Sequence, residues 1–289
     1  MCKFSVLLTV LVIGTAGFNF ANSSRDSQEP AQTKAQPAPS PEVLAKTVQI
    51  FLGADADVLV ETSDGKRIGF DFKSKKFVNE ILDARTIPRE TSTTYVLPFD
   101  KSGKLYKVMV SGKSATKVNA DLSMTGPGFV VGFRGVPLIS SQVQTMSIAS
   151  NGLQLSVTTN QDGPTPQIFI TTQSGRDKPS YRFEVLSSLL SAGKTITVNL
   201  DIINGRLYFE TGEVKKISFT VMMRRTNPGG TRDVYTHRDI SFGKTNTYAM
   251  DFGQWDGKGD MCFYDWCDSC EKRQCTKLKN ESIAKEPKP

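Results

Sequence analysis

Four of the five cysteines lie close together near the C-terminus, where they could form cross-links or hold a metal. Cys262, Cys267, Cys270 and Cys275 are spaced C-x4-C-x2-C-x4-C. In an exported chain such a cluster predicts two disulfides. Three pairings exist for four cysteines, and we favour a nested arrangement with Cys262–Cys275 around Cys267–Cys270. Because the loops are short, these bridges would fix the C-terminal segment rather than stabilise the whole fold.

Two other chemistries remain open for these cysteines. An extracellular metal-binding module could use all four thiolates for zinc, although zinc ligand pairs are usually well separated in sequence. Reduced or redox-active thiols are the third alternative. The pair Cys267-Asp268-Ser269-Cys270, however, lacks the β-α-β surroundings of a thioredoxin-like motif.

Catalytic residue patterns are incomplete. The single histidine, His237, has no nucleophile or acid at a recognisable spacing, so we expect a solvent-facing or hydrogen-bonded structural role. An exported hydrolase acting on polysaccharide or peptide would need paired carboxylates. Acidic residues are available, but nothing in the sequence aligns two of them: Asp201, Glu210, Glu213 and Asp233.

Some glycine-rich segments resemble ligand loops only superficially. Gly-Lys-Ser or Gly-Lys-Thr occurs at 112–114, 193–195 and 243–245, each without the upstream glycine of a phosphate-binding loop. In residues 256–260, Lys258 occupies a position where a calcium loop needs an oxygen ligand. We therefore predict turns at all four places and no cofactor.

Lys and Arg total 36 against 29 Asp and Glu, which gives a formal net charge of +7. An excess of this size, spread over the chain, indicates a solvated surface more than a dedicated patch. Weak binding to an anionic surface would depend on the clusters Lys73-Ser74-Lys75-Lys76 and Arg224-Arg225. No recognised nucleic-acid module is present, so specific nucleic-acid binding is not expected.

The N-terminal region has the features of an export signal. Lys3 precedes an apolar stretch that ends in small residues near Gly17 and Ala21, which predicts a signal peptide over residues 1–21. An uncleaved anchor helix is the alternative. Residues 22–41 are rich in Ser, Gln, Ala and Pro and predict a disordered linker. After signal removal we expect no transmembrane segment, because no later apolar run is long enough.

The elements that would position any site are short strands. A helix from Ser40-Pro41 to Gly53 is the one exception we predict, with a strand through 48–50 as the competing interpretation. Beyond it, apolar residues alternate with polar ones, and turn residues recur every 8–12 positions. Hairpins are predicted at four turns: Asp64-Gly65, Asp100 to Gly103, Asn151-Gly152 and Asn204-Gly205.

This pattern predicts an all-β fold of tandem antiparallel β-sandwich domains, Ig-like or jelly-roll-like. We place the first sandwich at 42–137 and the second, with the cysteine cluster, at 138–275. Residues 276–289 are predicted to be a flexible tail. The sequons at Asn22 and Asn280 then lie in flexible ends, where they could accept glycans if the source glycosylates exported proteins.

Two stretches have a distinctive order of residues. Residues 57–71, DVLVETSDGKRIGFD, precede Val78-Asn79-Glu80-Ile81, and residues 250–259 read MDFGQWDGKG. The first resembles a strand, a D-x-x-G-R-R-x-G turn and a V-x-N-E-I segment of uncharacterised bacterial exported proteins with Ig-like domains. The second resembles their W-x-G-x-G closing segment, but the aspartate-rich loop that often follows is replaced here by residues 265–270. The resemblance implies an exported sandwich protein and lends no activity.

We therefore expect a secreted, extracellular or periplasmic protein that binds or scaffolds at the cell surface and does not catalyse. Its partner would be a protein or a glycan. Two inward-facing carboxylates in one deep cleft would favour the hydrolase instead, and a flat, aromatic-lined sheet face would favour glycan binding.

Overall fold

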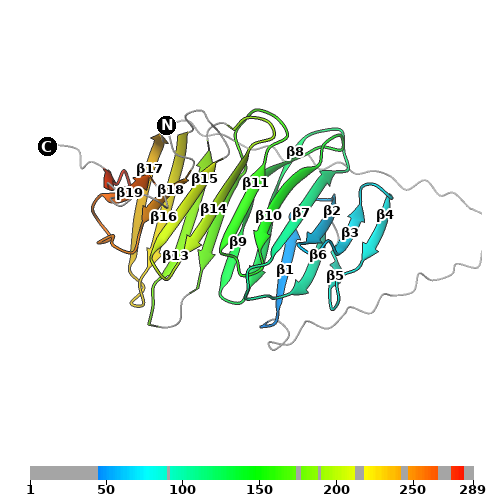
Figure 1. Ribbon diagram of the computed structural model, residues 1–289, viewed down its shortest axis with the longest axis horizontal. Helices are drawn as coiled ribbons and strands as arrows, with labels where there is room; N and C mark the ends of the chain where they lie inside the picture. The colour runs from blue at the N-terminus through cyan, green and yellow to red at the C-terminus, as the bar shows by residue number, and fades with distance from the viewer. Residues whose placement is uncertain are drawn as a thin grey trace, which may run out of the picture. The chain divides into compact units, whose positions relative to one another are not determined.

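Twenty antiparallel β-strands in two sheets make up the described part of the chain (Figure 1). The computed structural model describes residues 45–89, 92–173, 177–187, 190–211, 218–241, 247–265 and 275–282. All of them belong to one compact unit, Pro39–Pro289. These residues form no helix, and so none that is long and apolar enough to cross a membrane. The predicted all-β, antiparallel sandwich is confirmed.

The first sheet has nine strands. In spatial order they are β17 (Arg232–Ser241), β16 (Ser218–Thr226), β13 (Ser180–Ser187), β12 (Gln167–Thr172), β9 (Phe129–Leu138), β8 (Val118–Gly126), β1 (Thr47–Leu52), β6 (Thr93–Pro98) and β5 (Arg85–Pro88).

The second sheet has eleven strands. In spatial order they are β20 (Cys275–Leu278), β19 (Met261–Asp265), β18 (Thr247–Asp251), β15 (Arg206–Thr211), β14 (Thr195–Asp201), β11 (Gln154–Thr158), β10 (Gln144–Ala149), β7 (Leu105–Gly112), β2 (Ala56–Thr62), β3 (Arg67–Asp71) and β4 (Lys76–Asn79).

Alternation of apolar and polar side chains builds the core between the sheets. In β14, the sequence TITVNLD buries Ile196, Val198 and Leu200 and leaves the intervening residues partly exposed. The same period of two recurs in β8 and β16, because successive side chains point to opposite faces. Large side chains that are almost completely buried fill the interior: Tyr235, Tyr248, Phe133, Phe183, Phe209 and Phe219.

Consecutive hairpins alternate between the two sheets. The hairpins β8–β9, β12–β13 and β16–β17 belong to the nine-stranded sheet, and β10–β11 and β14–β15 belong to the other. Each hairpin pairs with the previous one on its own sheet, as β9 does with β12. The sandwich therefore extends regularly along its length, as a stack of similar units does.

This alternation bears on the predicted domain organisation. The boundary expected after residue 137 falls inside β9, and strands from both predicted sandwiches share both sheets. Of the two boundary markers, Gly126-Pro127-Gly128 forms the β8–β9 turn and Gly135-Val136-Pro137 lies within β9. The glycines and prolines that indicated a linker thus serve turns and bends inside one sandwich.

Three of the four predicted hairpins are confirmed. Gly65, Gly152 and Gly205 adopt positive φ at the β2–β3, β10–β11 and β14–β15 turns. The Asp100–Gly103 turn is wrong as a hairpin, because β6 and β7 lie in different sheets. This turn reverses the chain between the two sheets, and the strands on its two sides, β6 and β7, pair with strands of different sheets.

The predicted helix is wrong over Thr47–Leu52, which is strand β1 between β6 and β8. Sheet pairing on both sides overrides the helical spacing of its apolar residues. The flexible tail is wrong for residues 276–282, since β20 pairs with β19 and Asn280 is 4% exposed. The predicted signal peptide and linker lie outside the described residues.

Candidate functional site

The outer face of the nine-stranded sheet carries two hollows that could bind a ligand. We use "outer face" for the side of this sheet that faces away from the core. Its residues are those that alternate with the buried ones, such as Gln49 and Phe51 on β1 and Arg182 and Glu184 on β13. Eight inter-strand steps of roughly 4.8 Å make this face about 38 Å wide.

A shallow groove of about 740 Å³ crosses the outer face over β1, β6 and β8. Its lining combines hydroxyls, one amide, one guanidinium and one ring, from Gln49, Phe51, Arg89, Thr94, Ser123 and Thr125. Phe51 is 39% exposed, so it presents apolar surface to the groove. No carboxylate is among the described lining residues. The described residues of the groove therefore offer hydrogen bonds and an apolar contact.

A second, smaller hollow of about 190 Å³ lies over β12, β13, β16 and β17. Three arginines line it, Arg182, Arg224 and Arg232, together with hydroxyls of Thr171, Ser180 and Thr226. We call this hollow the arginine cradle. Arg182 is directly opposite Arg224 in the strand register, and Arg232 is opposite Thr226.

The charges of the arginine cradle are only partly neutralised. Arg182 donates from Nε to Glu184 at 2.7 Å, and Arg134 contacts the same carboxylate at 3.4 Å. Gln167 also donates to Glu184, at 2.9 Å. Within the part of the chain that the structure describes, Arg224 and Arg232 have no ion pair, and both are exposed. Two arginines thus share the Glu184 carboxylate and two have no described carboxylate, which leaves a positive surface open to solvent.

The groove and the arginine cradle are linked by strand register. One row of directly opposed residues crosses six strands, from Arg224 through Arg182, Thr171, Val130 and Thr125 to Gln49. The next row contains Phe51, Ser123, Gly132 and Phe169. An ideal Cβ at Gly132 would lie 2.0 Å from the Leu122 carbonyl oxygen, so only glycine fits this point of the face. The two hollows are parts of one continuous surface.

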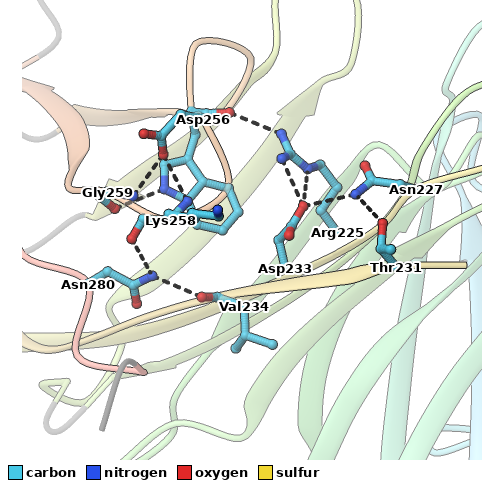
Figure 2. Close-up of polar contacts among 10 residues, drawn as sticks. Arg225, Asn227, Thr231, Asp233, Val234, Asp256, Lys258, Gly259 and Asn280 are labelled. Atoms are coloured by element: carbon cyan, nitrogen blue, oxygen red, sulfur yellow. Dashed lines mark hydrogen bonds and ion pairs between the residues drawn. The ribbon is translucent and has the colours of Figure 1, made fainter. Parts of the chain in front are cut away.

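Arg225, the neighbour of Arg224, faces the other way and is held by a polar network (Figure 2). Its Nε and Nη2 donate to Asp233 Oδ2 at 3.0 and 2.8 Å, and its Nη1 donates to the Trp255 carbonyl at 3.0 Å. The guanidinium also lies 5.2 Å from the centre of the Trp255 ring. Hydrogen bonds from Arg225 and then Asn227 lower the pKa of Asp233. Arg225 is therefore a structural residue, whereas Arg224 is available for a ligand.

Trp255 to Gly259 form a compact turn beside this network. The Asp256 carboxylate accepts hydrogen bonds from the amides of Lys258 and Gly259 at 2.8 and 2.7 Å. These amides lower the pKa of Asp256. The Trp255 indole donates to the Gly259 carbonyl at 2.9 Å. The predicted turn is confirmed, and its carboxylate is used to close it.

Asn280 anchors the C-terminal segment against the same region (Figure 2). Its Nδ2 donates to the carbonyls of Val234 and Lys258, and its Oδ1 accepts from the Thr236 amide. With its side chain buried and bonded in this way, Asn280 is not the accessible glycan acceptor that its sequon indicated. The other sequon, at Asn22, lies outside the described residues.

The cysteine cluster contains a disulfide. Cys262 on β19 and Cys275 on β20 are bonded, with Cα atoms 5.3 Å apart. This is the outer bridge of the favoured nested pairing, and Cys267 and Cys270 lie outside the described residues. A zinc site that uses all four thiolates is excluded in this state, because two of the sulfurs bond each other. Among the described residues, no group of three metal-ligating side chains comes together.

His237 and the described candidate carboxylates each make separate structural contacts, and His237 Nδ1 also lies 3.7 Å from Glu281 Oε1. His237 Nδ1 donates to the Lys279 carbonyl at 2.8 Å, which confirms its hydrogen-bonded role. Asp201 is engaged by Asn204 in the β14–β15 turn, and Glu210 accepts from Asn199. Asp233 is paired with Arg225, and Glu213 lies outside the described residues. The structure thus does not bring the described candidates together in one cleft.

Sequence reasoning missed the groove and part of the arginine cradle. Arg224-Arg225 was identified as a basic cluster, but the alternation that places the two side chains on opposite faces of the sheet was not recognised. A usable signal was present, because the buried series Phe219, Val221 and Met223 continues to Arg225. The groove had no such signal, since it brings together residues that are far apart in the sequence, such as Phe51 and Ser123.

Comparison with known proteins identifies no relative. No family model matches the sequence, and no curated protein or solved structure is similar to it. The resemblance to exported Ig-like proteins therefore remains a prediction, and the argument for function depends on the geometry of the outer face.

Proposed function

We propose that this chain is an exported, non-catalytic binding protein whose outer face holds an extended glycan at the cell surface or in the extracellular space. The groove beside Phe51 is the observation that carries the proposal. A glycan presents many hydroxyls and apolar ring faces, and the groove supplies partners for both. Gln49, Ser123 and Thr125 offer side-chain donors and acceptors around the exposed ring.

The shape of the groove favours binding over catalysis. It is open and lies on a sheet, whose strands are rigid supports for such a surface. A glycosidase needs two carboxylates on either side of the scissile bond. None of the described lining residues is a carboxylate, so no described residue of the groove could act as the general acid, the nucleophile or the base.

Export is supported by the chemistry of the C-terminus. The Cys262–Cys275 disulfide is of a kind that persists in oxidising compartments. Together with the predicted signal peptide, it favours a periplasmic or extracellular location. Mass spectrometry of the native protein tests the predicted export, because it measures which cysteines are thiols and which are in disulfides. Four free thiols at 262, 267, 270 and 275 would contradict it.

Affinity electrophoresis in gels that contain dextran, xylan, dextran sulfate or polygalacturonate tests the glycan proposal. We expect retardation by at least one polymer. Phe51→Ala should weaken it about five- to thirtyfold, equivalent to ~1–2 kcal/mol for one aromatic contact. Phe77→Ala is the matched control, since Phe77 is 56% exposed on β4 of the other sheet.

Three results would contradict the proposal. Retardation by none of the polymers would remove glycan binding. An equal loss in the Phe51 and Phe77 variants would show that the groove is not the binding surface. Release of new reducing ends from a retained polymer would favour the hydrolase instead.

A further inference from the structure

We propose that the arginine cradle binds the anionic groups of an acidic polysaccharide, with its carboxylates or sulfates held between Arg182, Arg224 and Arg232. This inference rests on the proposed glycan-binding function and names the class of ligand. It makes the outer face a two-part site, with the groove for sugar rings and the arginine cradle for negative charge.

The strand register brings two of the arginines together. Arg182 and Arg224 are directly opposed on neighbouring strands, an arrangement that destabilises a sheet when both carry like charge. Glu184 relieves Arg182, but Arg224 and Arg232 have no carboxylate among the described residues. An oxyanion between them would neutralise the repulsion. The guanidinium group suits this role, because its donors match carboxylate and similar anions in pairs.

Apart from Tyr181, the remaining lining of the arginine cradle is made of small hydroxyl side chains. Thr171, Ser180 and Thr226 place hydroxyls around the arginines, and the hollow of about 190 Å³ has room for a charged substituent. Neutral hydroxyl donors beside guanidinium groups provide further hydrogen bonds to oxyanion or sugar oxygens. The same side chains would be a poor surface for an apolar partner.

The arginine cradle and the groove are connected by one row of opposed residues. Four inter-strand steps separate Arg182 on β13 from Gln49 on β1, about 19 Å along one row. A linear polymer can follow this row and contact both hollows at once. A lipid headgroup would meet only the arginine cradle, whereas a polymer can reach the groove as well. We therefore favour a polysaccharide over a membrane.

The test uses the full chain and the double variant Arg224→Gln/Arg232→Gln. Neither residue has an ion pair in the described structure, so the fold should be retained. The probes are polygalacturonate for carboxylates, dextran sulfate for sulfates, neutral dextran, and vesicles of phosphatidylglycerol with phosphatidylcholine. The control Lys73→Gln/Lys76→Gln removes the same charge from exposed residues at the β3–β4 turn.

We expect the wild type to bind one acidic polymer more tightly than dextran, with an affinity that falls as salt screens the contact. The arginine variant should lose at least tenfold in affinity for that polymer, and the lysine control should lose less than threefold. The polymer that responds distinguishes carboxylate from sulfate recognition.

Other results would overturn the proposal. An unchanged affinity in the arginine variant, or an equal loss in the lysine control, would show that the arginine cradle is not the site. Binding to vesicles and to no polymer would assign the arginines to a membrane instead. If Phe51→Ala alone weakens binding, the glycan proposal survives and the cradle proposal fails. If no polymer binds, both fail together.

Discussion

Removal of Arg225 tests whether the two adjacent arginines have separate roles. The substitution Arg225→Met keeps the aliphatic stem over Trp255 and removes the guanidinium. It deletes two hydrogen bonds to Asp233 Oδ2 and one to the Trp255 carbonyl, together with the cation–π contact. Asp233 would keep only its hydrogen bond from Asn227 among the contacts drawn in Figure 2.

The expected cost follows from the partial burial of this pair. The side chains of Arg225 and Asp233 are 18% and 21% exposed, between a buried and a surface ion pair. Breaking a buried pair costs about 3–5 kcal/mol, and an exposed pair contributes about 0–1 kcal/mol. Allowing for screening, we expect a loss of about 2–3 kcal/mol. For a chain of this size that lowers Tm by roughly 4–12 °C.

Thermal and urea unfolding of the wild type, Arg225→Met and Arg224→Met measure the difference. Arg224→Met should change the free energy of unfolding by less than about 0.5 kcal/mol, as exposed substitutions usually do. The reasoning fails if the two variants lose similar stability, or if Arg225→Met unfolds within error of the wild type.

The pH dependence of the same variants is a second measurement. Because the folded-state pKa of Asp233 is lowered from its ordinary 3.8, this carboxylate contributes stability above that value. The contribution is lost as the pH falls through the lowered pKa. The stability difference between wild type and Arg225→Met should therefore be constant near neutrality and shrink in acid. A difference that grows on acidification would contradict the assignment.

Three further predictions concern the C-terminus and the core. The disulfide Cys262–Cys275 has a sequence separation of 13, so its reduction should lower the free energy of unfolding by about 3 kcal/mol. Amide hydrogen exchange should then become faster in residues 275–282 before it does in the central strands. Simultaneous exchange of the whole sandwich would contradict this. Asn280→Ala should lower the free energy of urea unfolding by about 2–3 kcal/mol, because it leaves the Val234 carbonyl and the Thr236 amide without this partner. A glycan on Asn280 of the folded protein would contradict its role as a buried anchor. Burial raises the pKa of Tyr95 and Tyr106 to about 12. The free energy of unfolding should therefore be unchanged below pH 10 and should fall by up to about 3 kcal/mol per pH unit as the pH rises toward 12. If the tyrosinate absorbance of the folded protein titrates entirely near pH 10, this prediction is wrong.

The fold class could be predicted because its signals are local. Alternation within β14 and the glycines of the tight turns depend on a few neighbouring residues. The pairing of strands could not be predicted in this way. Asp100–Gly103 has good turn residues, but whether such a turn closes a hairpin or connects two sheets depends on distant partners. Strand β1 illustrates the same limit, since β6 and β8 on its two sides impose the extended conformation.

The domain prediction went beyond what the sequence can support for a related reason. Length and turn-rich segments indicated two sandwiches, because each half is large enough to fold alone. Hairpins that alternate between two sheets need no boundary, since every hairpin pairs with the previous one on its sheet. Pro137 within β9 shows that a strand of this sheet tolerates residues that usually mark a linker.

The candidate site follows from this same construction. Gln49 and Arg224 are far apart in the sequence, and each is unremarkable in its own strand. Hairpin-by-hairpin growth places them at the two ends of one registered row, where neither sequence spacing nor local composition could have joined them. The period of two then selects Arg224 for the outer face and Arg225 for the network beneath it. A one-residue shift in the register of β16 would exchange these roles. If the row is the site, substitution of Arg225 should therefore lower the stability of the fold, and substitution of Arg224 should weaken ligand binding.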